Sequence, residues 1–105
     1  MTPASIDFGF GTAYERTEAV LELVRDERRR QDGLKSSGRF TYTCADREMM
    51  PAEKLAVLAE ELGEVAREVL SQDGLVSDGT GTNAAIREEL VQVAAIAVAW
   101  IEALE

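Results

Sequence analysis

Two acidic clusters in the second half of the chain carry side chains that could hold a hard metal ion. The first contains Glu60, Glu61 and Glu64, and the second contains Glu89 and Gln92. Glu61 and Glu64 are three positions apart, as are Glu89 and Gln92. This spacing places each pair of oxygen ligands on one face of a helix. Because Mg²⁺ and Mn²⁺ prefer oxygen ligands, the sequence predicts a metal site made of three carboxylates and one amide.

The segment between the clusters decides whether they can meet. Residues 73–81 are rich in turn formers and short enough to join two antiparallel helices. The pair Glu64 and Glu89 is centred on this segment, and so is the pair Glu61 and Gln92. If the chain folds back there, at about 1.5 Å per helical residue, the four side chains come to the same height.

Helix signals divide the rest of the chain. Thr12 and Glu15 have the spacing of a capping box, and the helix that they begin is expected to end near Gln31, before Gly33. Pro51 suits the first turn of a second helix. The sequence thus predicts an N-terminal arm at 1–11, a helix at 12–31, an irregular connector at 33–50, a second helix from 51 to about 72, and a third helix that begins after Thr82 or Asn83 and continues to residue 105.

The third helix is too apolar for so short a chain to bury by itself. Between Leu90 and Ile101 its only polar side chain is Gln92, so this stretch needs burial on several sides. Two further helices are not expected to cover it. We therefore predict one all-α domain, 1–105, that forms an antiparallel helical bundle completed by homo-oligomerisation, as a homodimer or a homotetramer.

Composition excludes several partners and chemistries. The 105 residues carry 20 acidic and 11 basic side chains, and the net charge of −9 would repel a nucleic acid polymer and an anionic membrane. There is no histidine, which rules out Ser-His-Asp and Cys-His catalysis, the usual zinc sites and a Glu-x-x-His di-iron site. Cys44 is the only cysteine and the N-terminus has no signal-like apolar run, so a cytoplasmic location is expected.

Positive charge is expected among the carboxylates. Glu61, Glu64 and Glu89 border apolar residues, where an uncompensated charge is costly or shifts its pKa. Lys54 is one candidate, either as a salt-bridge partner of Glu61 or as a ligand of a substrate phosphate. One lysine cannot balance three carboxylates, so a divalent ion is expected as well. The only basic run, at 28–30, spreads around its helix and is interpreted as a solvated helix end, with phosphate contact as the lesser alternative.

The two helices that carry the clusters resemble a known family. Residues 54–70 (KLAVLAEELGEVAREVL) and 88–104 (EELVQVAAIAVAWIEAL) are similar to the MazG-like, all-α nucleoside triphosphate pyrophosphohydrolases. The family pattern is EExxE, a variable gap and then ExxD. Its first part is present at 60–64, and its second part appears at 89–92 with Gln92 in place of the aspartate. The resemblance covers roughly the C-terminal half of the chain.

The resemblance implies a reaction and a role for each of these residues. The reaction would be hydrolysis of a (d)NTP between the α and β phosphates, which gives a (d)NMP and pyrophosphate. Glu60 would orient the attacking water or support the metal ligands, and Lys54 would meet a phosphate oxygen. The ligands of Mg²⁺, or alternatively of Mn²⁺, would be Glu61, Glu64, Glu89 and Gln92.

Gln92 weakens the expected metal site and leaves other functions open. Its amide oxygen can coordinate a hard cation but brings no charge, so the site has three negative charges where the family has four. Weaker metal affinity is expected. One alternative is a non-catalytic oligomerisation or interaction module that has lost the enzyme's activity. A second alternative keeps the reaction but acts on a phosphoribosyl nucleotide.

Overall fold

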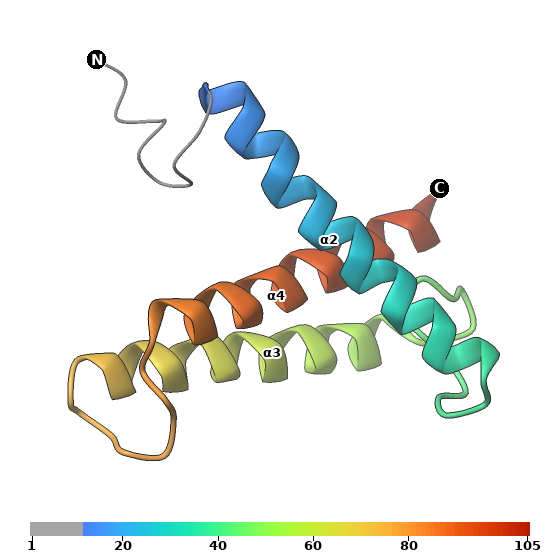
Figure 1. Ribbon diagram of the computed structural model, residues 1–105. Coiled ribbons are helices and arrows are strands. Elements are labelled where there is room, and N and C mark those ends of the chain that lie inside the picture. The colour runs from blue at the N-terminus through green and yellow to red at the C-terminus, as the bar shows by residue number, and fades with distance from the viewer. Residues whose placement is uncertain (1–11) are drawn as a thin grey trace.

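The computed structural model describes residues 12–105, which form three helices and, within that range, no strand (Figure 1). The helices are α2 (Ala13–Ser36), α3 (Pro51–Gln72) and α4 (Asn83–Leu104). This confirms the predicted all-α fold. The arm expected at 1–11 lies outside the described residues.

The first helix is longer than predicted. It begins with the expected capping box, in which the Thr12 hydroxyl accepts a hydrogen bond from the backbone of Glu15 and the Glu15 carboxylate accepts one from the backbone of Thr12. The helix then continues through Gly33 to Ser36. The predicted end before Gly33, and the predicted start of the connector at 33, are therefore wrong. The glycine that adopts the left-handed conformation typical of a helix end is Gly38, with φ 84°.

The second and third helices begin and end as predicted. Pro51 occupies the first turn of α3, and the Glu53 carboxylate accepts a hydrogen bond of 3.0 Å from the backbone of Met50. Gly74 follows the end of α3 with φ 77°. Thr82 is the residue that caps α4, through a 3.0 Å hydrogen bond from a backbone N–H of its first turn.

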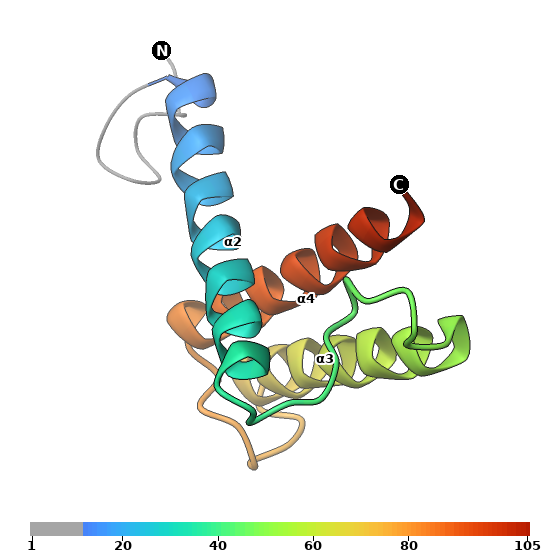
Figure 2. The same ribbon diagram turned by 90° about the vertical axis from the view of Figure 1, so that its right-hand side faces the viewer.

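The helices form an open arrangement in which α4 is the central element. The chain turns back through 73–82, so that α4 lies alongside α3 (Figure 1). Helix α2 crosses α4 steeply, and its first half stands away from the other two helices in both views. Figure 2 shows the segment 37–50, in green, running from the end of α2 to the start of α3. Within the described chain, α2 packs against α4 but not against α3.

A buried arginine holds α2 on α4. Only 8% of Arg28 is exposed, and its guanidinium donates to Glu102 of α4 at 2.9 Å and to Asp32 at 3.1 Å. The interpretation of all of 28–30 as a solvated helix end is therefore wrong for Arg28. It holds for Arg29, which is exposed and pairs with Asp26 on its own helix.

The core of the described chain is small and leaves apolar surface uncovered. Its buried residues Cys44, Ile96 and Ala99 pack against partly buried neighbours from α3 and the 37–50 segment. Several large apolar side chains of α3 and α4 remain exposed by about half or more: Leu55, Leu62, Leu90, Ile101 and Leu104. None of the helices within 12–105 is both long and apolar enough to cross a membrane.

Candidate functional site

A cavity of about 360 Å³ lies between α2, the 37–50 segment, α3 and α4. Two kinds of side chain line it. The first kind is polar, half of it acidic, and includes Glu27, Arg30, Gln31, Glu60, Glu61 and Gln92. The second kind is aromatic or apolar, and includes Phe40, Tyr42, Met49, Val57 and Ile96. A pocket that holds a ligand with a charged part and a planar part needs both kinds of side chain.

Glu61 is a carboxylate whose surroundings favour a cation. Burial raises its pKa, and the negative charges of nearby carboxylates, first Glu89 and then Glu60, Glu64 and Glu27, raise it further. Its Oε2 atom is buried and accepts no hydrogen bond. A buried carboxylate oxygen without a donor favours either a proton or a bound cation.

Glu89 shares this environment. Burial raises its pKa, and so do the charges of Glu64 and Glu88, whereas the guanidinium of Arg67 acts in the opposite direction. Glu61, Glu64 and Glu89, which the sequence predicts as ligands of one metal ion, therefore lie within electrostatic range of one another across α3 and α4.

Glu61 and Glu64 nevertheless differ in their partners. Glu64 forms an ion pair of 2.7 Å with Arg67, whereas Glu61 faces the cavity without a cationic partner at contact distance. Among residues 12–105, no group of three acidic or cysteine side chains is close enough to hold a metal ion. The donor atoms and their charge therefore fit a hard divalent ion, but they are not already arranged around a common centre.

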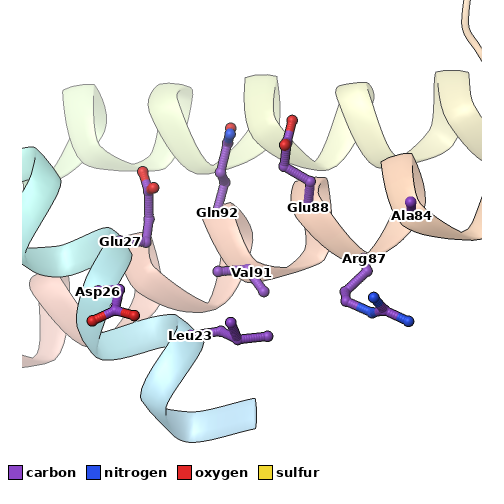
Figure 3. Close-up of a pocket in the computed structure, with 8 residues that line it drawn as sticks. All are labelled: Leu23, Asp26, Glu27, Ala84, Arg87, Glu88, Val91 and Gln92. Atoms are coloured by element: carbon purple, nitrogen blue, oxygen red, sulfur yellow. The ribbon is translucent and has the colours of Figure 1, made fainter. Parts of the chain in front are cut away.

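Of the three carboxylates predicted beside Gln92, only Glu61 lines the same cavity as Gln92, and Glu64 and Glu89 do not line it. Gln92 also lines a second cavity of about 350 Å³ between α2 and α4. Figure 3 shows that Glu27 from α2 and both Gln92 and Glu88 from α4 point in the same direction, toward α3. Gln92 thus stands between two carboxylates from different helices.

Lys54 lies away from the cavity. Only 3% of it is exposed, it does not line the cavity, and it forms no ion pair with Glu61. The pKa of Asp46 is lowered, first by the hydrogen bond from Lys35 and then by that from the backbone of Thr43, and the charge of Lys54 adds a smaller effect in the same direction. The charge of Lys54 also favours the ionised form of Cys44. The pKa of Cys44 is nevertheless raised, because burial outweighs this effect.

The sequence does not predict that α2 contributes to the cavity, which Glu27, Arg30 and Gln31 line. The Glu27 carboxylate is mostly buried and pairs with Arg30 at 2.7 Å. The hydrogen bond and charge of Glu27 raise the pKa of Arg30, and the charge of Glu61 raises it further. The three-residue spacing of Glu27 and Arg30 was a readable sign of their pairing. Their position beside Glu61 depends on the crossing of α2 over α4, for which the sequence gives no signal.

Glu68 of α3 has a structural role. Its Oε1 atom accepts hydrogen bonds from the backbone N–H groups of Thr80 and Gly81, at 3.0 and 2.8 Å, and from the Thr80 hydroxyl at 3.0 Å. These bonds, first the one from Gly81, lower the pKa of Glu68. The carboxylate therefore ties the loop that precedes α4 to the last turns of α3.

Replacing Glu68 with glutamine should destabilise the protein in a pH-dependent way. At pH 7 we expect a thermal midpoint lower by roughly 5 °C, because a charged acceptor of several hydrogen bonds is lost. The folded-state pKa lies below the unfolded value of about 4.3. The contribution of ionised Glu68 is therefore present above that value and is lost as the pH falls through the folded pKa. Melting curves should show the difference between wild type and Glu68→Gln narrowing between about pH 5 and pH 3; a constant difference would contradict this role.

Comparison with protein-family models, curated proteins and solved structures found no match to this chain. Its function is therefore inferred from its own residues and their geometry.

Proposed function

We propose that the protein is a Mg²⁺-dependent nucleoside triphosphate pyrophosphohydrolase, which hydrolyses a (d)NTP to a (d)NMP and pyrophosphate. The observation that carries this proposal is the buried, unpartnered Oε2 atom of Glu61 within a group of mutually repelling carboxylates, at the wall of a cavity of about 360 Å³. A cavity of this size is in the range of small-molecule sites.

The carboxylates of Glu61, Glu64 and Glu89 and the amide oxygen of Gln92 are the proposed ligands of Mg²⁺, with Mn²⁺ as a substitute. When bound, the ion would neutralise phosphate charge and help to align the triphosphate for attack. Because Gln92 is neutral, the site supplies three negative charges, and we propose that its metal affinity is correspondingly modest.

The other cavity residues suit the remaining needs of the reaction. Glu60 is exposed at the cavity wall, where its carboxylate can orient a water molecule and accept its proton. Arg30 replaces Lys54 as the proposed phosphate ligand, because Arg30 lines the cavity and Lys54 does not. Phe40 and Tyr42 are each about half exposed at the same cavity, where their rings can stack on a nucleobase.

We further propose that α3 and α4 form an antiparallel pair completed by further copies of the chain, as a dimer or tetramer. The support is the exposed apolar surface of these helices, of which Leu62 and Ile101 are the clearest examples at 57% and 58% exposure. A soluble chain rarely leaves so many large apolar side chains in water.

The same apolar surface favours the second candidate function, a non-catalytic oligomerisation module. The absence of a preassembled group of three metal ligands within residues 12–105 also favours it. Binding of divalent ions separates the two functions. Mg²⁺ or Mn²⁺ should raise the thermal midpoint of the enzyme by ligand linkage and leave that of a purely structural module unchanged.

The direct test is to measure the release of pyrophosphate and nucleoside monophosphate. The purified protein is incubated with canonical and modified NTPs and dNTPs, and with phosphoribosyl nucleotides, in the presence of Mg²⁺ or Mn²⁺. Glu61→Ala serves as the inactive variant, and Glu48→Ala as a matched control, because Glu48 is exposed on the 37–50 segment and does not line the cavity.

Release that is retained in Glu48→Ala and lost in Glu61→Ala supports the proposed enzyme, and the preferred compound identifies its substrate class. Release that persists in Glu61→Ala, or its absence with every compound and metal, contradicts the proposal and favours the oligomerisation module.

A further inference from the structure

Arg67 lies among the carboxylates that are proposed to bind the metal ion. Its guanidinium forms an ion pair of 2.7 Å with Glu64 and lies 3.7 Å from Glu68. Its charge also reaches Glu89 on the neighbouring helix. Arg67 is therefore the cation that the sequence leads one to expect among these carboxylates, at a different position from Lys54.

Two properties of Arg67 distinguish it from an ordinary surface arginine. Its Nε atom is buried and donates no hydrogen bond, so one donor of the guanidinium lacks a partner. About 40% of the side chain is nevertheless exposed, as is 39% of Glu64. A salt bridge with this exposure is weak and can be exchanged for another partner at little cost.

A divalent ion on Glu64 would have to compete with this guanidinium. Both are cations that need the same carboxylate oxygens, and a carboxylate in direct contact with arginine is less available to a metal ion. When it is released, the arginine retains a planar set of N–H donors that matches the oxygens of a phosphate group.

We propose that Arg67 is an internal counter-ion that a divalent cation displaces from Glu64, and that the displaced guanidinium then binds a phosphate group of the substrate. This inference rests on the proposed pyrophosphohydrolase function and adds a residue that the resemblance does not supply. Arg67 thereby couples two binding events, because the metal ion frees the side chain that holds the triphosphate.

The variant Arg67→Met separates these two roles. Loss of the guanidinium removes the competitor of the metal ion, so the affinity for Mn²⁺ should rise by roughly tenfold, the size expected for a unit charge near a divalent ion in a water-like dielectric. The affinity for a triphosphate in the presence of Mn²⁺ should fall in the same variant. Arg67→Lys keeps the charge but loses the planar donors, so it should bind the triphosphate more weakly than wild type does and gain little in Mn²⁺ affinity.

The experiment is a titration with Mn²⁺ alone, followed by electron paramagnetic resonance or calorimetry, and then a titration with a non-hydrolysable nucleoside triphosphate at saturating Mn²⁺. Arg29→Met is the matched control, because it changes the net charge equally at an exposed position of α2 that pairs only with Glu22 and Asp26. Pyrophosphate release is measured in parallel for wild type.

Tighter Mn²⁺ binding and weaker triphosphate binding in Arg67→Met, with Arg29→Met like wild type, would establish both roles. If wild type releases pyrophosphate but Arg67→Met binds Mn²⁺ no more tightly than wild type, the inference about Arg67 fails and the proposed function stands. If wild type hydrolyses no nucleotide but Arg67→Met binds Mn²⁺ more tightly, the counter-ion role stands, while the phosphate role and the proposed function fail. If neither protein binds Mn²⁺, both proposals are overturned.

Discussion

Replacing Glu61 with glutamine is expected to remove pyrophosphate release and, at the same time, to make the metal-free protein more stable. Activity should fall by about 10²–10³-fold or more, because the change removes a charge from the proposed metal site. The thermal midpoint at neutral pH should rise by roughly 2–5 °C, because a partly buried carboxylate without a donor is replaced by a neutral side chain of the same shape.

The pH dependence of this effect follows from the raised pKa of Glu61, which burial and neighbouring carboxylates cause. A carboxyl whose folded pKa is raised destabilises the protein when it ionises, so the penalty appears as the pH rises through the folded value. Below the unfolded value of about 4.3, wild type and Glu61→Gln should therefore melt at similar temperatures.

Melting curves without metal and activity assays with Mg²⁺ check these two effects on the same protein samples. Glu48→Gln is the control for a loss of charge at an exposed position that does not line the cavity. A Glu61→Gln variant that is both less active and less stable would indicate that Glu61 stabilises the fold, and it would contradict the interpretation of Glu61 as a site prepared for a cation.

Replacing Gly81 with alanine should destabilise the protein by about 3 kcal/mol, because two effects add. Gly81 has φ 68°, a conformation that residues with a Cβ atom rarely adopt. A Cβ atom there would also lie 2.8 Å from the backbone nitrogen of Gln72 and 2.9 Å from the carbonyl carbon of Ser71. Both neighbours belong to the backbone at the end of α3, so neither can move away by a change of rotamer.

Gly74→Ala is a matched control, because Gly74 also has a positive φ, of 77°, but no atom lies within 4 Å of an added Cβ atom. Its cost should be limited to the backbone conformation, about 1 kcal/mol. In a domain of this size the two variants should lower the thermal midpoint by roughly 15 °C and 5 °C. Equal effects of the two substitutions would show that the close approach of 81 to the end of α3 is unimportant for stability.

The regular part of the fold was readable from the sequence because its signals are local. A capping box at Thr12 and Glu15, a proline at 51, a glycine at 74 and a threonine at 82 each act on the nearest helical turn, and each is found in its predicted role. The end of α2 was misjudged because Gly33 takes a helical conformation and the left-handed position falls on Gly38.

The sequence predicted which residues of the candidate site lie close together only where both residues belong to α3 and α4. Symmetry about the turn predicted that Glu64 and Glu89 come to the same height on these helices, and after burial the charge of Glu64 is the largest cause of the raised pKa of Glu89. The contribution of α2 could not be predicted, because no local signal in its sequence specifies how it crosses α4. Arg67 was not predicted for another reason: an arginine three residues after Glu64 has the spacing of an ordinary helical ion pair.

The connectivity of the helices sets an order in which the molecule assembles. Helices α3 and α4 are joined by a short loop, whereas the Arg28–Glu102 contact that holds α2 joins residues 74 positions apart. Closing the longer loop costs more chain entropy, so we expect the α3–α4 pair to form early in folding and α2 to dock afterwards. Since α2 contributes Glu27 and Arg30 to the cavity, we expect the cavity to be completed by the last folding step and to be the first feature lost when the native state opens locally.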